Sequence, residues 1–262
     1  MDAEQQQKRF NIKHLLLVIL VLIIGLGVVL SIRQLPFDRE YEPPTALVNM
    51  LPRYRVIDMD DIGIETDADR DGINDQKDIM LGAKKQLEVK AKNILLMPDE
   101  PNYYQGGDPP GDLALATDIV DRAFREAGYG LRELVNEDIN QNFDQYPLRA
   151  IWNQKYSDPD IDYRRIQNLE VFFRRNAEPL TAIFNPAEKD NLQQWLPGDV
   201  VFFDMDRDGY TDNVGIVSDS TTRSGATKVI YNYIEPGYTV EKDILGKEKI
   251  TGHFRYPKPD AF

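Results

Sequence analysis

The sequence predicts an α+β domain, in which several helices pack on one face of an antiparallel sheet. Between residues 76 and 176, apolar side chains recur at three- and four-residue spacing, which is typical of amphipathic helices. From residue 199 to residue 256, short runs of β-branched and aromatic residues alternate with turn residues, as in antiparallel strands. Helices followed by strands in this way indicate an α+β fold. With 42% hydrophobic and 10% aromatic residues, the chain has enough apolar material for a packed core.

The chain is organised around residues 111–128, where a Gly/Pro loop runs into an amphipathic helix with the sequence GDLALATDIVDRAFREAG. Thr117 and Asp118 lie in its first turn, where such side chains complement unpaired backbone N–H groups. Further helices are expected over 76–93, 131–143 and 165–176, and strands over 199–204, 214–218, 228–234 and 250–256.

The N-terminal part of the chain has the features of a membrane anchor. Residues 15–32 contain no charge over 18 positions, a length that just spans the hydrocarbon core of a bilayer. Basic residues precede this segment, so the positive-inside rule predicts a cytoplasmic tail (1–14), a transmembrane signal-anchor helix (15–32) and an extracytoplasmic remainder. A cleaved signal peptide is the alternative, but SIRQLPF offers no small-x-small cleavage site. We therefore expect a single-pass protein of the cell membrane, with an extended stalk over 33–66.

A net charge of −13 and the absence of cysteine exclude several classes of function. The acidic balance speaks against nucleic acid and anionic lipid as partners, since both would be repelled. Without cysteine, the chain forms no disulfide, no thiolate metal site and no cysteine nucleophile.

An aspartate-rich loop with the spacing of a calcium-binding loop opens the segment 67–97. In TDADRDGINDQKDI, aspartates and Gly72 occupy loop positions 1, 3, 5, 6, 9 and 12. This spacing lets alternate side chains converge on one cation while the glycine makes the sharp turn. The loop resembles the calcium loops of thrombospondin type 3 and dockerin repeats, and the alternative is a solvated acidic turn. The predicted calcium ligands are Asp67, Asp69, Asp71, Asp75 and Asp78.

A second loop, in FFDMDRDGYTDNVG, matches positions 1, 3, 5, 6 and 9, but its position 12 is Gly215. Calcium would bind more weakly there without a terminal bidentate carboxylate. A charged hairpin turn built on Asp-Gly is an equally good interpretation. The candidate ligands are Asp204, Asp206, Asp208 and Asp212.

Eight segments in order carry a resemblance to a known family: YYQGGDPPGD, ATDIVDRAFREAG, LVNEDINQNFDQYP, IDYRRIQNLEVFFRR, WLPGDVVFFD, NVGIVSD, VIYNYI and ITGHFRYP. From Tyr103 to Pro257, the chain resembles the YijF-like family (domain-of-unknown-function family 1287). That family is similar to NlpC-type, papain-like cell-wall cysteine peptidases, so the resemblance implies a papain-like domain over 98–262. Those enzymes use a cysteine at a helix start, a histidine on the adjoining strand and a third polar group on the next strand.

Carried over by motif, these three functional positions are all replaced. The cysteine falls on Ala116, the histidine before Gly-Ile-Val-Ser-Asp on Asn213, and the later His-Asn on Tyr231 and Asn232. Alanine has no nucleophile and asparagine accepts no proton at neutral pH, so cysteine-peptidase chemistry is impossible here.

The remaining candidates for a site have commoner structural roles. His253, Asp108, Asp112 and Asp118 could act as acid or base, but hydrogen bonding and helix capping are more usual for such residues. Arg164 and Arg165 are expected to pair with the neighbouring Asp160 and Asp162. The predicted ligand-binding residues around a remnant groove are Tyr103, Tyr104, Asp118, Asn213, Tyr231 and His253.

The sequence thus supports three functions. The first is a membrane-anchored, extracytoplasmic, catalytically degenerate peptidase-like protein that binds a cell-wall peptide or an envelope partner, with calcium-stabilised loops. The second is an active cell-wall hydrolase or amidase with a metal or carboxylate mechanism, and the third is a structural envelope module. The replaced triad favours the first and third. An open groove lined by Tyr104, Asn213 and Tyr231 would support binding, and a groove filled by side chains would support the structural module.

Overall fold

The computed structural model describes residues 17, 19–23, 64–222 and 225–258. The chain divides into two compact units, Met1–Met50 and Leu51–Phe262. Leu17 and residues 19–23 are helical, and the rest of the predicted anchor (15–32) lies outside the described residues, as do the tail and most of the stalk. Among the helices of the described ranges, none is both long and apolar enough to cross a membrane.

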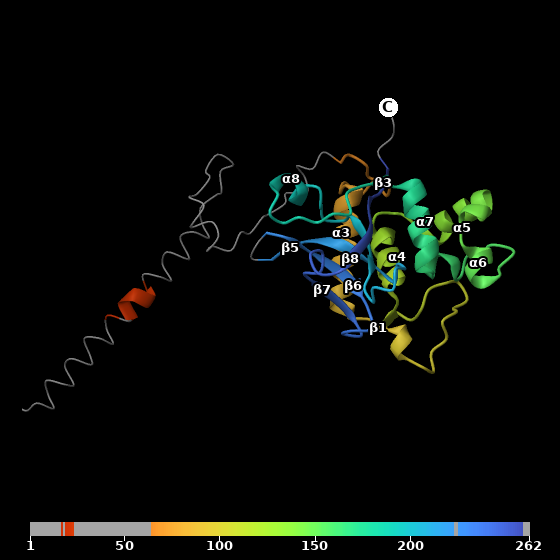
Figure 1. The fold of residues 1–262 in the computed structure, drawn as a ribbon, viewed down its shortest axis with the longest axis horizontal. Coiled ribbons are helices and arrows are strands. Elements are labelled where there is room, and N and C mark those ends of the chain that lie inside the picture. Colours follow the sequence, from red (N-terminus) through yellow and green to blue (C-terminus); the bar gives the residue numbers. More distant parts are fainter. Residues whose placement is uncertain (1–16, 18, 24–63, 223–224, 259–262) are drawn as a thin grey trace, which may run out of the picture. The chain divides into compact units, whose positions relative to one another are not determined.

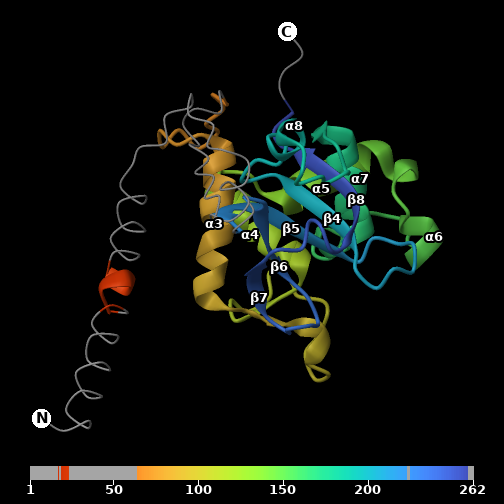
Figure 2. The same ribbon diagram turned by 60° about the vertical axis from the view of Figure 1, so that its left-hand side comes forward.

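The second unit is an α+β fold, as the sequence predicts (Figure 1). In chain order the elements are α3 (Asp75–Val89), β1 (Lys92–Asn93), η2 (Ile94–Leu96), β2 (Leu113–Ala114), α4 (Ala116–Glu126), α5 (Leu131–Asn142), η3 (Phe143–Gln145), α6 (Leu148–Trp152), η4 (Asp162–Arg164), α7 (Ile166–Asn176), β3 (Glu178–Pro179), α8 (Lys189–Leu192), β4 (Val200–Asp204), β5 (Asn213–Thr221), β6 (Thr227–Asn232), β7 (Thr239–Lys242) and β8 (Lys249–Arg255). Four longer helices precede most of the sheet in the chain, and in Figure 2 the first of them, α3, stands to the left of the strands, with α5 and α7 to the right.

The main sheet has the strand order β3-β8-β4-β5-β6-β7, and every pairing in it is antiparallel. A separate parallel pair joins β1 to β2. Consecutive strands from β4 to β7 are neighbours, which is the usual outcome of short connections. The last strand, β8, returns to pair with β4, so the beginning of β5 and the end of β4 lie at the centre of the sheet.

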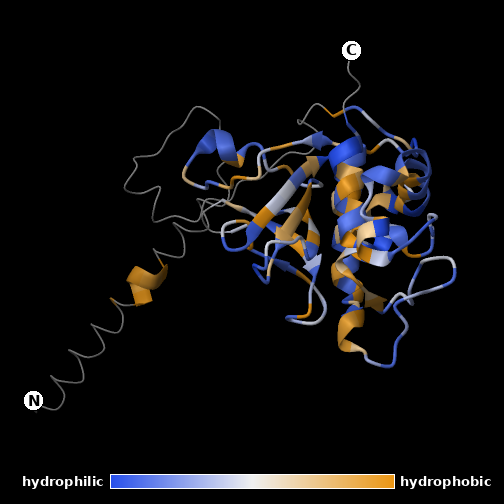
Figure 3. Ribbon diagram, turned by 45° about the vertical axis from the view of Figure 1, so that its right-hand side comes forward, coloured by the Kyte–Doolittle hydropathy of each residue, from blue (hydrophilic) through white to orange (hydrophobic). Residues whose placement is uncertain are grey.

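Both faces of the central strands are buried, and successive residues of β4 enter two different cores. Val200 and Phe202 join the core shared with the helices, whereas Val201 and Phe203 join a smaller core on the opposite face. Loop residues close that second face, with Trp195 as the largest buried side chain of the domain. Hydrophobic colouring accordingly marks the strands and the helix faces beside them, and most connecting loops are hydrophilic (Figure 3).

The segment that contains the first aspartate loop packs into the same core as the rest of the domain. Ile79 and Ala83 of α3 are fully buried in the helix-side core. At Gly82 a Cβ atom would lie 2.6 Å from the carbonyl oxygen of Ala123, so α3 and α4 approach so closely that only glycine fits. The helix ends at Val89, four residues before the predicted end, where Lys90 adopts a left-handed conformation.

Candidate functional site

The three positions onto which the resemblance carries a peptidase triad come from neighbouring elements, and their side chains are buried. Ala116 begins α4, Asn213 begins β5, and Tyr231 on β6 pairs with Gly215. Their exposed fractions are 9%, 0% and 4%. Helix α4 contacts both β5 and β6, so side chains fill the region where a groove was expected.

Each of the three side chains has a role in packing or hydrogen bonding. Ala116 belongs to the helix-side core, and Tyr231 belongs to the core on the other face, where burial raises its pKa. The Asn213 amide nitrogen lies 2.9 Å from the Met205 sulfur, and its carbonyl oxygen accepts a hydrogen bond from the Val214 N–H. The predicted contact of Asn213 and Tyr231 with a ligand therefore lacks an open surface.

Asp118 stabilises the start of α4 through a buried ion pair. Its carboxylate accepts hydrogen bonds from the Arg164 guanidinium at 2.6 and 3.0 Å and from the Leu115 N–H at 2.7 Å. Both charged side chains are at most 1% exposed. The expected pairing of Arg164 with Asp160 or Asp162 was wrong, because burial places it against Asp118, 46 residues away in sequence.

Arg165, by contrast, pairs with Asp162 at 2.9 Å, as expected for residues three apart. Its guanidinium also lies over the Trp152 ring, 4.2 Å from the ring centroid. Arg165 is therefore held between an acid and an aromatic ring of its own domain.

His253 is a buried structural residue of β8. One ring nitrogen lies 3.0 Å from an Asp199 carboxylate oxygen, and the other lies 2.8 Å from the Thr181 carbonyl oxygen. The ring stacks on Trp195, with centroids 4.0 Å apart. Asp199 also receives two hydrogen bonds from Arg255. Both imidazole nitrogens are thus occupied by protein groups, which leaves none for a ligand.

Tyr103 and Tyr104, two of the three tyrosines predicted to bind a ligand, lie near the surface. Tyr103 is 50% exposed, and its hydroxyl is 3.5 Å from the carboxylates of Asp158 and Asp160. The Tyr104 ring lies under the Arg164 guanidinium at 5.1 Å, and its buried hydroxyl has no hydrogen-bond partner. Tyr103 is therefore the most accessible of the predicted ligand-binding residues.

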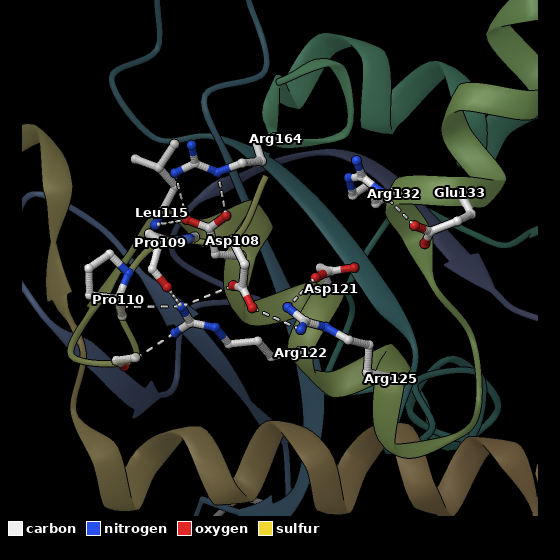
Figure 4. A network of polar contacts seen from close by, with 12 residues as sticks. Asp108, Pro109, Pro110, Leu115, Asp121, Arg122, Arg125, Arg132, Glu133 and Arg164 are labelled. Atoms are coloured by element: carbon white, nitrogen blue, oxygen red, sulfur yellow. Dashed lines mark hydrogen bonds and ion pairs between the residues drawn. The ribbon is translucent and has the colours of Figure 1, made fainter. Parts of the chain in front are cut away.

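A hollow of about 260 Å³ lies beside the second turn of α4, and the sequence did not predict it (Figure 4). It is bounded by the glycine loop, by α4, by the start of α5 and by Tyr163. The loop approaches Tyr163 closely, since a Cβ atom on Gly107 would lie 2.9 Å from the Tyr163 hydroxyl. The lining residues are Gly106, Asp108, Asp121, Arg125, Arg132, Glu133 and Tyr163.

Both signs of charge line this hollow. Arg125 bonds Asp108 at 2.9 Å and Asp121 at 2.6 Å, and Arg132 bonds Glu133 at 2.8 Å. The Asp121 side chain is only 4% exposed, and burial raises its pKa to about 6. Such a polar lining suits a ligand that carries ammonium and carboxylate groups. The spacing of Asp121 and Arg125, four residues apart on a helix, was the only local signal, and it is typical of solvated helix faces.

The two aspartate loops have the same internal geometry. In each, three carboxylates lie within 4.8 Å of one another, from Asp67, Asp69 and Asp71 and from Asp204, Asp206 and Asp208. In each, the position-1 aspartate accepts a hydrogen bond from the N–H of the position-6 glycine, at 3.0 and 3.1 Å. The aspartate at position 5 accepts one from the residue at position 7, at 2.8 Å in both loops.

The aspartates at position 9 do not join these clusters, although the loop pattern predicts them as calcium ligands. Asp75 accepts hydrogen bonds from the Ala68 N–H at 2.8 Å and from the Tyr129 hydroxyl at 2.6 Å. Asp212 accepts the corresponding bonds from Met205 and from the Tyr233 hydroxyl, at 2.9 and 3.0 Å. Position 9 thus serves in both loops to fasten the loop to a distant tyrosine.

The model of the domain of unknown function DUF1287 matches residues 86–256. The chain belongs to the DUF1287 family. It is also 36% identical over 153 residues to the uncharacterized protein YijF of Escherichia coli (strain K12), a match that covers 58% of this chain and 69% of that protein. The predicted membership of the YijF-like family is confirmed. The DUF1287 match starts within α3, so the loop at 67–78 and the first turns of that helix lie before it.

Proposed function

We propose that this DUF1287 protein is a catalytically degenerate, NlpC-type and papain-like module, anchored outside the cytoplasm by residues 15–32, that binds a cell-wall peptide or an envelope partner. One observation carries the non-catalytic part of the proposal. Ala116, Asn213 and Tyr231 occupy the three positions where a cysteine peptidase needs a thiol, a base and an orienting group, and all three are buried. They supply no nucleophile and no general base.

The filling of the predicted groove by side chains on its own supports the structural module, so the binding part of the proposal rests instead on the polar hollow beside α4. Asp121 and Arg132 present opposite charges to it, from different helices (Figure 4). Cell-wall peptides carry free ammonium and carboxylate groups, which these side chains would pair with. The charged side chains around the hollow already form ion pairs with one another. A bound ligand would replace some of these pairs with contacts to its own charged groups.

One observation on Asp121 favours the second candidate function, that of a hydrolase or amidase. A buried carboxylate with a pKa of about 6 in a cavity has the protonation behaviour of a general acid or base. The other aspartate that lines the hollow, Asp108, is partly buried, but its hydrogen bond to Arg125 lowers its pKa, which is why we place this function second.

Purified full-length protein in detergent, incubated with a mixture of muropeptides, separates these functions. Mass spectrometry would detect cleavage, and calorimetric titration would measure binding. We expect binding without cleavage, weakened roughly tenfold or more by Arg132→Gln or Asp121→Asn, because each removes a charged hydrogen-bond partner. Arg149→Gln is the matched control, since Arg149 is exposed and its partners, the Asp144 carboxylate and the Phe143 ring, do not line the hollow.

Cleavage that Asp121→Asn abolishes would replace the binding module with the hydrolase. Binding that neither variant weakens would exclude the hollow as the site. If the full chain neither binds nor cleaves muropeptides, the structural module becomes the better proposal, and a protein partner in the envelope would be sought instead.

A further inference from the structure

The first aspartate loop brings several negative charges close together. The carboxylates of Asp67, Asp69 and Asp71 lie within 4.8 Å of one another just before α3. The ion pairs formed among the described residues include none to these three aspartates or to Asp78. Like charges held this close repel one another unless a cation lies between them.

Asp78 supplies the independent observation that points to a ligand. This residue of the first turn of α3 is 5% exposed, and its Oδ2 atom is buried with no hydrogen-bond partner. Asp78 is not one of the three carboxylates that lie within 4.8 Å of one another, but it occupies position 12, where calcium loops carry their terminal carboxylate ligand. A buried carboxylate oxygen without a donor is costly unless a group absent from the protein chain compensates it.

We propose that residues 67–78 form a calcium site in which Asp67, Asp69, Asp71 and Asp78 provide the carboxylate ligands. An all-oxygen set with several carboxylates suits a hard divalent cation. Calcium is preferred to magnesium because it accepts a larger and less regular set of protein oxygens, whereas magnesium usually keeps several waters. The site lies outside the region matched by the DUF1287 model and does not depend on the proposed function of the hollow.

A cation in this loop would brace the N-terminal end of α3 against two other parts of the domain. Asp75 receives the Tyr129 hydroxyl at 2.6 Å, and Gln76 donates hydrogen bonds to Asp199 and to the Pro197 carbonyl at 2.8 and 3.0 Å. At Gly128 a Cβ atom would lie 3.0 Å from the Asp69 Cβ. Fixing the loop therefore fixes contacts of the turn between α4 and α5 and of the segment before β4.

Calorimetric titration of the full-length protein with calcium, paired with thermal unfolding, tests the site. Two variants remove ligand charge while keeping side-chain size, Asp71→Asn at an exposed position and Asp78→Asn at the buried one. We expect each to weaken calcium binding roughly tenfold or more, since affinity follows the number of charged ligands. Asp78→Asn should also unfold in chelator at a temperature no lower than the original protein, because it removes a buried charge that lacks a partner.

The control variant is Asp190→Asn, which alters an exposed aspartate far from either loop in sequence and should leave calcium binding unchanged. The same titration of Asp208→Asn separates the two loops. The proposal is overturned if calcium at about 10 mM, above the range for extracellular modules, produces neither heat nor a thermal shift. It is equally overturned if Asp71→Asn and Asp78→Asn bind like the original protein, or if only Asp208→Asn loses binding.

Discussion

The two aspartate loops share one local design and differ in how their charge is balanced. Both place a non-glycine residue in the left-handed region at position 4, Arg70 with φ 63° and Arg207 with φ 62°. Both have a glycine at positive φ at position 6, and in both the aspartate at position 9 accepts a hydrogen bond from a tyrosine hydroxyl. The same local sequence pattern therefore forms the same backbone turn in both loops.

The difference comes from the residues that meet each loop from elsewhere in the fold. At the second loop, Lys249 of β8 lies opposite Asp204 in the sheet, and its Nζ atom is 2.5 Å from the Asp204 carboxylate. That contact holds the pKa of Asp204 below its usual range. At the first loop, Asp78 adds a further negative charge. The second loop thus carries its own cation, whereas the ion pairs of the described residues include none to the three clustered aspartates of the first.

The largest expected effect is the loss of calcium stabilisation when the first loop is altered. At a free calcium concentration about 100 times the dissociation constant, occupancy stabilises the fold by about 2.7 kcal/mol. For a domain of this size that raises the unfolding temperature by about 5–10 °C. Asp71→Asn, with binding weakened tenfold or more, should reduce this stabilisation to about 1.4 kcal/mol or less and at least halve the shift, measured by thermal unfolding with calcium and with chelator. Asp208→Asn, at the same position of the second loop, should retain the full shift. Equal losses in both variants would contradict the difference between the loops.

A smaller effect is expected from the tyrosines that fasten position 9. Tyr129→Phe leaves the buried Asp75 without one of its donors and should lower the free energy of unfolding by about 2 kcal/mol. Tyr233→Phe should cost about 1 kcal/mol, because the same Asp212 oxygen keeps the Asp206 N–H at 3.1 Å. Denaturant unfolding in chelator measures both values free of calcium. If Tyr233→Phe lowered the free energy of unfolding as much as Tyr129→Phe does, the two loops would depend equally on their tyrosines.

The pH dependence of the free energy of unfolding can be followed at a buried acid outside both loops. Asp121 has a folded pKa of about 6, above the value of 3.8 for an unperturbed aspartate, so its ionisation opposes folding. The free energy of unfolding should therefore rise as the pH falls from 7 to 5, with a contribution from Asp121 of about 1 kcal/mol. Asp121→Asn removes this contribution, whereas Asp71→Asn keeps it. A pH profile that Asp121→Asn leaves unchanged would show that another group dominates.

Local patterns predicted the secondary structure well and the site poorly, and the reason is physical. The helix at 131–143 and the strand at 199–204 were found within one residue at each end, because periodicity and turn residues are local signals. The strand at Thr239–Lys242 and the two-residue strands β1, β2 and β3 were not predicted. Their strand conformation comes from pairing with a partner rather than from their own sequence.

The same reasoning explains which ion pairs and site residues could be predicted. The bond between Arg165 and Asp162 follows from a three-residue spacing, but the bond between Arg164 and Asp118 depends on the packing of α4 against η4. The hollow combines Gly106, Asp121 and Arg132, which belong to three different segments. Lys249 likewise meets Asp204 only because β8 returns to the centre of the sheet. Charge balance in this protein is a property of the tertiary fold.

The smallest expected change in stability is also the sharpest test of the difference between the loops. Lys249→Met removes the cation that lies at Asp204 while keeping the length of the aliphatic stem. The Lys249 side chain is 54% exposed, so the ion pair contributes at most about 1 kcal/mol. The Asp204 Oδ1 atom is already buried without a hydrogen-bond partner, as the Oδ2 atom of Asp78 is at the first loop, and the substitution leaves the three clustered carboxylates without a lysine.

We therefore expect a stoichiometry of one calcium ion for the original protein and of two for Lys249→Met, with the second ion bound weakly because position 12 is Gly215. Calorimetric titration gives the number of ions, and adding Asp208→Asn to the variant should return that number to one. Lys247→Met is the control, since Lys247 is similarly exposed but pairs with Asp243 outside the loop. If Lys249→Met still binds a single ion, the resident lysine is not what keeps calcium from the second loop, and the missing ligand at position 12 is the sufficient cause.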